Sequence, residues 1–312
     1  MQKLRLFVLA CFLVVFFVNA ASAAEPGKIR IAAGSLLDGY YSMGLKVCRY
    51  ISKSNGGIPC EVVPTTGSLE NLWLLQRGKV DLAFTLSNLA LDSHSGKGYF
   101  ATTKPFKDMY QVLRLHNEVF TVLVKDDDKI LVFSDLEGRK ISNGPPKSDS
   151  SVTYKALEAY YDFKKSPIDV ELAHEDYAKE FCRGNIDAVM MMTGHPSALV
   201  NFITHACESD FVAIDSDKID LLLKNNPGFH KVILPAGGYP GITQDQESVA
   251  VQAILVAANH VDGKIIQNLL DYFPKIVDRF KSSNPALYDL DKEHFTNGFI
   301  LPALPVGKID NK

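Results

Sequence analysis

Short apolar runs alternate with segments of helical spacing through the first two thirds of the chain. The runs that we interpret as buried strands are residues 29–32, 60–63, 80–85, 139–143, 168–172 and 186–191. A helix-like segment follows each run, and strands that alternate with helices are typical of parallel sheets covered by helices. The pattern therefore predicts an α/β fold.

Two of the predicted helices carry a clear apolar stripe. In residues 265–280 the apolar positions recur at intervals of three and four, at Ile266, Leu269, Leu270, Phe273, Val277 and Phe280. Residues 152–163 repeat this spacing at Val152, Ala156, Tyr160 and Phe163. Such periodicity places apolar side chains on one side of a helix, so each segment is expected to bury one face.

One stretch of sequence occurs twice in related form. The segment LLQRGKVDLAF, residues 74–84, returns as EFCRGNIDAVM at residues 180–190. Both copies combine a helix end, an Arg-Gly pair that stops the helix, and a strand entered through an aspartate. Two copies predict two lobes built on one plan, the first from residues 25–117 with 241–312 and the second from residues 118–240. Strand-like crossings near residues 112–124 and 229–243 would form the hinge.

The first residues have the features of a cleaved secretory signal. Lys3 and Arg5 precede an apolar run from Leu6 to Val18, and small residues come before Glu25. The apolar run is shorter than the ~20 residues that span a bilayer, which argues against a membrane anchor. We therefore expect residues 1–24 to be removed and the mature chain to be periplasmic.

Composition argues against a polyanion as the partner. The 33 Lys and Arg residues include Lys3 and Arg5 of the signal, so against 36 Asp and Glu residues the mature chain is mildly acidic. A nucleic-acid partner is therefore not expected. The sequence also lacks the G-x-S-x-G and H-E-x-x-H motifs, and we predict no cofactor and no metal site.

Four cysteines remain in the mature chain: Cys48, Cys60, Cys182 and Cys207. An oxidising compartment favours disulfides, and four cysteines permit three pairings. The spacing favours Cys48 with Cys60 and Cys182 with Cys207, because each pair closes a short loop. A metal site that uses His205 with Cys207 is the alternative, but no C-x-x-C motif supports it.

Small hydroxyl and glycine residues follow several predicted strands and open the next helices. In open α/β sheets the carboxyl ends of the strands form the crevice that holds ligands, and free N–H groups at helix starts can receive an anion there. Helix capping explains the same residue types, and for one position alone it is the simpler interpretation. Several such positions around one crevice favour a binding site.

The order of the motifs resembles the TAXI-class solute receptors of TRAP transporters. The motifs are Gly34-Ser35 with Gly39-Tyr40-Tyr41, PTTGSLENLWLLQRGKVDLAF, HNEVFTVLV, DLEGRKISNGPP, RGNIDAVMMMTGHPS and ILPAGGYPG. The resemblance implies a type II periplasmic-binding-protein fold, in which two α/β lobes joined by a two-stranded hinge close on a ligand. It also implies delivery of a small organic acid or amino acid, glutamate-like or a dicarboxylate, to the separate membrane permease of a TRAP transporter. We expect a monomer that is not an enzyme.

By position, the resemblance implies ligand contacts from both lobes. The first lobe would supply Gly34, Ser35, Tyr40, Thr66, Gly67, Ser68 and Ser87, and the second lobe Ser148, Ser150, Thr193, Gly194 and His195. Tyr40 or Tyr41 would place an apolar ring with a hydroxyl tip against the ligand. Related receptors also carry cysteines at the 48/60 and 182/207 positions, which supports the same pairing.

Asp149 departs from the family pattern at the start of its helix. Many members have Gly-Ser-Gly with a nearby arginine, where this chain has Lys147-Ser148-Asp149 and Ser151. An aspartate there satisfies the helix terminus itself and repels a second carboxylate. The sequence therefore favours a zwitterion whose ammonium meets Asp149, or a less charged solute, over a dicarboxylate.

Two other functions are compatible with the same architecture. An enzyme would need a reactive side chain with a partner, and His195 with Ser150 is the one arrangement worth testing. A host-interaction or adhesion protein would present broad apolar or repeated surfaces, which the sequence does not show. Binding of a small molecule is the function that the sequence favours.

Overall fold

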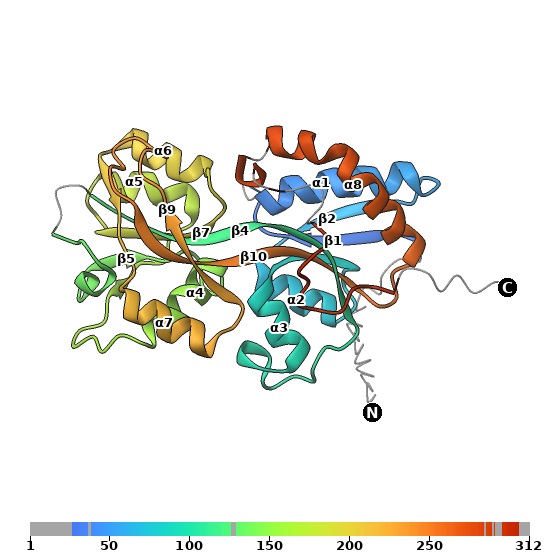
Figure 1. Cartoon of the computed structure of the whole chain (residues 1–312), viewed down its shortest axis with the longest axis horizontal. Helices are drawn as coiled ribbons and strands as arrows, with labels where there is room; N and C mark the ends of the chain where they lie inside the picture. The colour runs from blue at the N-terminus through green and yellow to red at the C-terminus, as the bar shows by residue number, and fades with distance from the viewer. Residues whose placement is uncertain are drawn as a thin grey trace, which may run out of the picture.

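The computed structural model describes residues 27–36, 39–125, 129–283, 285–288, 290 and 295–305. The predicted signal, residues 1–24, lies outside the described residues. The described elements form two α/β lobes side by side, and two long strands run through both (Figure 1). The predicted α/β fold, with two lobes joined by two strands, is therefore confirmed.

The first lobe is built around three short parallel strands. Its strands are β1 (Ile29–Ala33), β2 (Cys60–Pro64) and β3 (Leu82–Leu86), and its helices are α1 (Gly39–Ser54), α2 (Ser68–Gln76), α3 (Ser87–Ser95) and α8 (Gly263–Ser283). The strands pair in the order β2-β1-β3. Helices α1 and α8 cover one face of the sheet, and α2 and α3 cover the other (Figure 1). Two 3-10 helices, η1 (Gly98–Phe100) and η4 (Pro285–Leu287), complete the lobe.

The second lobe repeats this layered arrangement. Its strands are β5 (Lys140–Ser142), β6 (Ile168–Asp169), β7 (Ala188–Thr193), β8 (Ser209–Phe211) and β9 (Phe229–Leu234). Its helices are α4 (Asp149–Glu158), α5 (Tyr177–Cys182), α6 (Ala198–Ala206) and α7 (Ser216–Asn225), with the 3-10 helices η2 (Phe133–Leu136) and η3 (His174–Asp176). Strands β6, β5 and β7 pair in parallel. Helices α5 and α6 lie on one face, and α4 and α7 lie on the other (Figure 1).

Strands β4 (Met109–Lys125) and β10 (Gln246–Ala258) join the lobes. They pair with each other in antiparallel orientation and also pair with strands of both lobes, so one sheet of ten strands runs through the molecule. Parallel pairing, which the alternation of strands and helices predicts, is confirmed within each lobe. It is wrong at the centre, because β10 carries the chain back across the sheet.

The two crossings differ in how well the sequence located them. The predicted crossing at residues 112–124 lies within β4. The predicted crossing at residues 229–243 is wrong, because β9 ends at Leu234 and turns back to pair with β10 inside the second lobe. Gly237 and Gly241, both with positive φ, lie in this turn, and β10 then makes the crossing. The predicted lobe boundaries at residues 117 and 240 stay a prediction.

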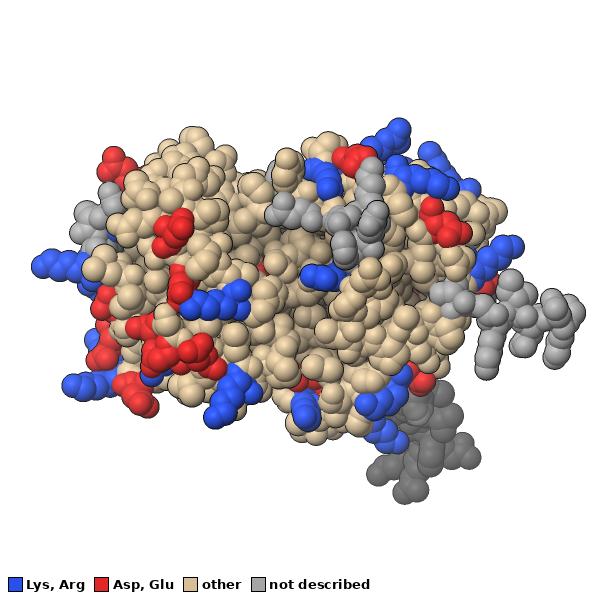
Figure 2. All heavy atoms as spheres, viewed as in Figure 1, with Lys and Arg blue, Asp and Glu red and all other residues tan. Residues whose placement is uncertain are grey.

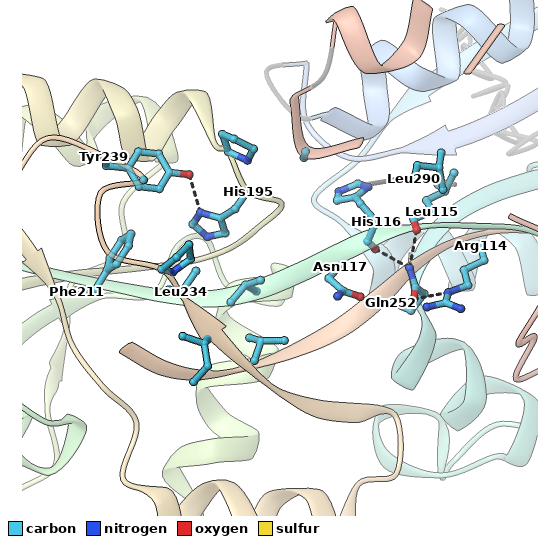
Figure 3. Close-up of a pocket in the computed structure, with 17 residues that line it drawn as sticks. Arg114, Leu115, His116, Asn117, His195, Phe211, Leu234, Tyr239, Gln252 and Leu290 are labelled. Atoms are coloured by element: carbon cyan, nitrogen blue, oxygen red, sulfur yellow. Dashed lines mark hydrogen bonds between the residues drawn. The ribbon is translucent and has the colours of Figure 1, made fainter. Parts of the chain in front are cut away.

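The pairing of β4 with β10 is irregular next to His116. The register shifts between Gln252, which faces Asn117, and Ile254, which faces Arg114. A bulge leaves ladder groups without their regular partners. The Gln252 side chain supplies the missing partner, since its Nε2 donates to the carbonyl oxygens of Leu115 at 2.7 Å and His116 at 2.9 Å (Figure 3). Its Oε1 accepts a hydrogen bond from the Nε of Arg114 at 2.7 Å.

We expect Gln252→Leu to lower the free energy of unfolding by about 1–2 kcal/mol, because buried groups that lose a hydrogen-bond partner cost that order of energy. Leucine has a similar size but leaves the two carbonyl oxygens and Arg114 without this partner. Urea denaturation measures the change. Gln267→Leu, at an exposed position of α8, is the matched control and should change stability by less than about 0.5 kcal/mol. Equal effects of the two substitutions would contradict the role given to Gln252.

The repeated sequence segment forms the same structure in both lobes. Helices α2 and α5 end just before Gly78 and Gly184. The φ values of these two glycines, 64° and 75°, lie in the left-handed region, which favours glycine. Asp81 and Asp187 follow, and each accepts a hydrogen bond at 2.7 Å from a main-chain N–H of the neighbouring parallel strand, β1 or β5. The prediction that the two segments share one plan is confirmed.

The predicted helix faces are confirmed for α8 and only in part for α4. Along α8, the side chains of Ile266, Leu269, Phe273 and Val277 are buried. Helix α4 ends at Glu158, whereas the spacing predicts a helix that continues to residue 163. Tertiary contacts override the periodicity there. Tyr161 leaves the helical path to donate a hydrogen bond to Asp215 at 2.8 Å, and its ring stacks on Phe163.

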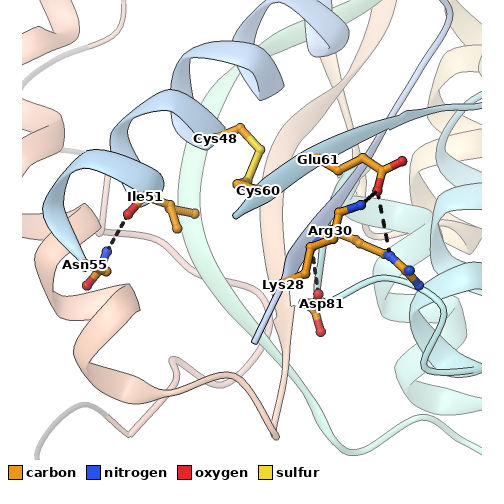
Figure 4. The surroundings of a disulfide bond; sticks show 8 residues. All are labelled: Lys28, Arg30, Cys48, Ile51, Asn55, Cys60, Glu61 and Asp81. Carbon is orange, nitrogen blue, oxygen red and sulfur yellow. Dashed lines mark hydrogen bonds and ion pairs between the residues drawn. A yellow bond between two sulfur atoms is a disulfide. The ribbon is translucent and has the colours of Figure 1, made fainter. Parts of the chain in front are cut away.

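Both predicted disulfides are present. Cys48 in α1 bonds Cys60 at the start of β2, beside the ion pair of Lys28 with Glu61 (Figure 4). Cys182 at the end of α5 bonds Cys207, which follows α6. Closing loops of these lengths stabilises a fold by roughly 3 kcal/mol each in the chain-entropy account. The alternative metal site at Cys207 is wrong, because the thiol is used in the disulfide.

Candidate functional site

The two lobes touch at the carboxyl ends of their parallel strands. Ser68 is the first residue of α2, and Asp149 is the first residue of α4. The Ser68 main-chain N–H donates to Asp149 Oδ1 at 3.0 Å, and the Ser68 hydroxyl donates to Asp149 Oδ2 at 2.8 Å. A carboxylate at a helix N-terminus satisfies free N–H groups and the helix dipole. Here it does so for a helix of the opposite lobe.

Other contacts between the lobes leave little space. The Lys147 ammonium lies 5.4 Å from the centre of the Trp73 ring of α2. Three glycines lie where a side chain would meet the other lobe. A Cβ at Gly67 would lie 3.2 Å from Asp149 Oδ1, one at Gly228 would lie 2.6 Å from Asn88 Cβ, and one at Gly194 would lie 2.5 Å from Ala286 Cβ. The lobes are therefore close together in this structure.

A small cavity of about 40 Å³ lies beside the contact of Ser68 with Asp149. The residues that line it come from both lobes and from β4: Tyr40, Thr66, Gly67, Glu118, Ser148, Asp149, Ser150, His174 and Met192. Six of these are residues that the sequence predicts for the site: Tyr40, Thr66, Gly67, Ser148, Asp149 and Ser150. Ser68 is joined to this group through Asp149.

A larger cavity of about 740 Å³ lies over the crossing strands (Figure 3). Small-molecule sites usually have volumes of about 300–1,000 Å³. Its walls come from β4, β8, β9 and β10 and from the segments around His195, Tyr239 and Leu290. His195 is the one predicted site residue in this lining. Sequence reasoning missed the rest because they are apolar or belong to strands, which carry no signal that distinguishes a cavity wall from a core.

The remaining predicted site residues line neither cavity. These are Gly34, Ser35, Tyr41, Ser87, Thr193 and Gly194. Gly34 accepts a hydrogen bond from the Thr65 main-chain N–H at 3.3 Å, and Thr193 donates to Ser197 Oγ at 3.1 Å. Tyr41 packs against the core under α8, Ser87 is buried at the start of α3, and Ser35 is exposed.

The serines of α4 have structural roles inside the second lobe. Ser148 caps α4, and its hydroxyl accepts a hydrogen bond from the Ser151 main-chain N–H at 3.2 Å. Ser150 accepts a hydrogen bond from the main-chain N–H of Met192 at 2.9 Å, which ties α4 to β7. Capping, the alternative explanation for hydroxyl residues at strand ends, therefore applies to Ser148. Both serines also line the small cavity.

His195 uses both ring nitrogens within the protein. The Thr121 hydroxyl donates to the Val119 carbonyl oxygen at 3.1 Å and therefore accepts from His195 Nε2 at 2.8 Å. This leaves His195 Nδ1 to accept from the Tyr239 hydroxyl at 2.6 Å (Figure 3). Ser197 donates its main-chain N–H to the same hydroxyl at 2.6 Å. Burial lowers the pKa of His195 to about 4 and raises the pKa of Tyr239 to about 12. A neutral ring without a free nitrogen is a poor base, and no hydrogen bond joins it to Ser150.

The lowered pKa of His195 predicts a stability loss in mild acid. The unfolded chain takes up the proton near pH 6.5 and the folded chain only near pH 4, so stability falls as the pH drops through this window. We expect wild type to lose about 2.5 kcal/mol more than His195→Gln between these values, because one pKa unit corresponds to about 1.4 kcal/mol and each state is half protonated at its own pKa. Urea denaturation at several pH values measures the difference. Parallel curves for the two proteins would contradict it.

Glu118 and His174 are lining residues that the sequence analysis missed. Glu118 lies in β4 and is 7% exposed, and its Oε1 is hydrogen-bonded to His116 Nε2 at 2.7 Å. A charged residue inside an otherwise apolar strand, as in the motif HNEVFTVLV, is the signal that could have found it. Burial lowers the pKa of His174, whose Nε2 has no hydrogen-bond partner in the described part of the chain. The pair of His116 with Glu118 separates the cavities, since His116 lines the larger one and Glu118 the smaller.

On the face of the molecule shown in Figure 2, charged side chains lie mainly toward the outer parts of both lobes. In the view of Figure 2 the seam between the lobes is mostly uncharged, and acidic side chains gather on the second lobe. Among the described residues, no three His, Cys, Asp or Glu side chains form a group that could hold a metal ion. No helix in the described ranges combines the length and apolarity required to cross a bilayer.

Comparison with known proteins places this chain among bilobal binding proteins by fold. Residues 31–305 match the NMT1-like family. The periplasmic aliphatic sulphonate binding protein SsuA of Escherichia coli is 17% identical, with a TM-score of 0.50 over 84% of this chain and 78% of that one. A protein of Listeria monocytogenes, described as a proposed L-cystine ABC transporter, is 13% identical, with a TM-score of 0.52 over 85% of this chain and 98% of that one. These similarities establish the type II periplasmic-binding-protein fold.

Proposed function

The chain belongs to the NMT1-like family, and from that premise we propose that it is an extracytoplasmic receptor that captures a small organic acid or amino acid between its lobes. One observation carries the proposal. The N-termini of α2 and α4, from opposite lobes, face each other beside a cavity lined by polar groups of both. Ligand contacts shared by two lobes favour the closed form by the extra affinity that this form provides.

The receptor would deliver its ligand to the permease of a membrane transporter. The order of motifs, which resembles TAXI-class receptors, supports a TRAP-type permease driven by an ion gradient. The similar protein of Listeria monocytogenes is described as a proposed L-cystine ABC transporter, so an ABC-type permease is the second candidate. Uptake of the ligand by cells that carry the receptor and its permease distinguishes the TRAP type from the ABC type. Loss of uptake after collapse of the sodium gradient supports the TRAP type, whereas loss only after depletion of ATP supports the ABC type.

The proposed location is the periplasm, and the proposed state is a monomer. The apolar leader of residues 1–24 and the two disulfides support export to an oxidising compartment. An enzymatic role finds no support in the arrangement of His195, whose nitrogens are both used by Tyr239 and Thr121.

Ligand binding by the purified, stripped protein is the test. A panel of L-glutamate, succinate and neutral amino acids is titrated by calorimetry, and ligands that co-purify are identified by mass spectrometry. A dissociation constant in the micromolar range or below, about −8 kcal/mol, is expected for at least one member. Absence of binding by every member together with absence of any co-purified small molecule would contradict the proposal.

A further inference from the structure

We propose that the ligand of the small cavity carries a protonated amine that binds Glu118, and that diacids without an amine are rejected. This inference rests on the proposed receptor function and names the substrate class of the same site. It differs from the ligand set that the family resemblance implies, because a dicarboxylate is excluded. Glu118, which the motifs did not single out, becomes the residue that determines specificity.

The lining of the small cavity is acidic. Glu118 and Asp149 are the carboxylates among its nine lining residues, and none of the nine is lysine or arginine. Lys147, two residues before Asp149 in the chain, points elsewhere, since its ammonium lies over the Trp73 ring. Like charges close together repel each other, so two carboxylates in one small cavity favour a cation and disfavour a further anion.

The place that a ligand carboxylate would take is filled by the protein. An anion that binds at a helix N-terminus accepts hydrogen bonds from its free N–H groups. At α2 the acceptor is Asp149, which takes both the N–H and the hydroxyl of Ser68. A diacid would have to displace Asp149 from Ser68 and would then lie near two carboxylates. The positive charge of a protonated amine would instead be attracted by the same two carboxylates, Glu118 and Asp149.

The carboxylate of Glu118 can accept more hydrogen bonds than the described residues donate to it. Among the described residues, His116 is its one hydrogen-bond partner, through Oε1, although Glu118 is only 7% exposed. His174 Nε2, from η3 of the second lobe, is buried without a partner in the described part of the chain. Buried polar atoms without partners are costly, so both groups favour a polar occupant. Tyr40 adds an aromatic ring to the lining, and aromatic rings attract ammonium groups.

The volume of the cavity suits an amine head group. A cavity of about 40 Å³ exceeds the roughly 10–15 Å³ that a cavity needs to hold one water molecule, and an ammonium group is similar in size to water. A whole amino acid is larger than this. Binding therefore requires the contact of Ser68 with Asp149 to separate while the ligand enters.

Pairs of ligands that differ by the amine test the proposal on the unmodified protein. The pairs are L-glutamate with glutarate, L-alanine with propionate, and 1,4-diaminobutane with 1,4-butanediol, each titrated by calorimetry. We expect the amine-bearing member of at least one pair to bind tenfold or more tightly than its partner. Binding of glutarate or propionate as tight as that of the matching amino acid would overturn the proposal and leave the receptor function standing. Absence of binding by all six compounds would overturn the proposal, and it would overturn the receptor function as well only if no small molecule co-purifies with the protein and no member of the wider panel binds.

Glu118→Gln then locates the amine. This substitution keeps the size of the side chain and removes its charge, and we expect tenfold or greater loss of affinity for the amine-bearing ligand. Glu180→Gln, at a partly exposed position of α5 that lines neither cavity, is the matched control and should leave affinity unchanged. Equal affinities of wild type and a folded Glu118→Gln protein would show that the amine binds elsewhere. If that variant does not fold, the comparison of ligand pairs decides the proposal.

Discussion

Gly194→Ala is expected to weaken the binding of L-glutamate, or of the panel ligand that binds most tightly, by about a hundredfold. A methyl group at residue 194 would lie 2.5 Å from Ala286 Cβ and closer still to the ring of His116, so the lobes could not approach as they do here. Overpacking of this kind costs up to about 3 kcal/mol, and each factor of ten in affinity is worth about 1.4 kcal/mol. Calorimetry with wild type and variant measures the ratio.

Small-angle scattering of the unliganded proteins tests the same steric effect without a ligand. The variant should have a larger radius of gyration than wild type, because the methyl group holds the lobes apart. Gly263→Ala is the matched control, since the nearest atom to the added methyl group is Pro305 O at 4.0 Å. If Gly194→Ala leaves both the affinity and the radius of gyration unchanged, the closed arrangement is not the form that binds ligand.

Phe84→Ala is expected to lower the free energy of unfolding by about 3–5 kcal/mol, the usual cost of removing a buried aromatic side chain. Phe84 is fully buried in β3, and its ring stacks on that of Tyr40 at 5.6 Å between centroids. Because Tyr40 lines the small cavity, the substitution should also weaken ligand binding. Urea denaturation and calorimetry measure the two effects.

The matched control for this substitution is Phe202→Ala in α6, where the phenylalanine is 62% exposed. Removal of an exposed ring is expected to change stability by no more than about 0.5 kcal/mol. A loss of stability in Phe84→Ala no larger than in the control would mean that the core around β3 is not packed as described.

Local signals in the sequence predicted most of the fold. Five of the six predicted strands correspond to β1, β2, β3, β5 and β7, and the sixth keeps only the two residues of β6. These strands are short and bounded by turns, and β1, β3 and β7 are mostly buried, as the apolar runs predict. The prediction of burial is wrong for β2 and β6, in which no residue is buried. The Arg-Gly helix ends and the aspartates after them were recognisable because each lobe uses the same backbone geometry.

The parts that the sequence did not predict depend on how distant segments meet. The turn after β9 and the crossing by β10 are decided by pairing between strands, for which both 229–243 and 246–258 offered suitable residues. The contact of Ser68 with Asp149 joins two helix starts in different lobes, and capping signals do not specify such a partner. The charge of Glu118 within an apolar strand is a local signal, but its position in the small cavity depends on the path of β4 between the lobes.

Trp73 is the sole tryptophan of the chain, and its position gives the protein a built-in optical probe. Its indole belongs to α2 in the first lobe, while the cation over its ring belongs to Lys147 in the second. Separation of the lobes would move that cation away and admit water to the ring. The emission of this one fluorophore therefore depends on whether the two halves of the molecule are together, and no label has to be attached to follow it.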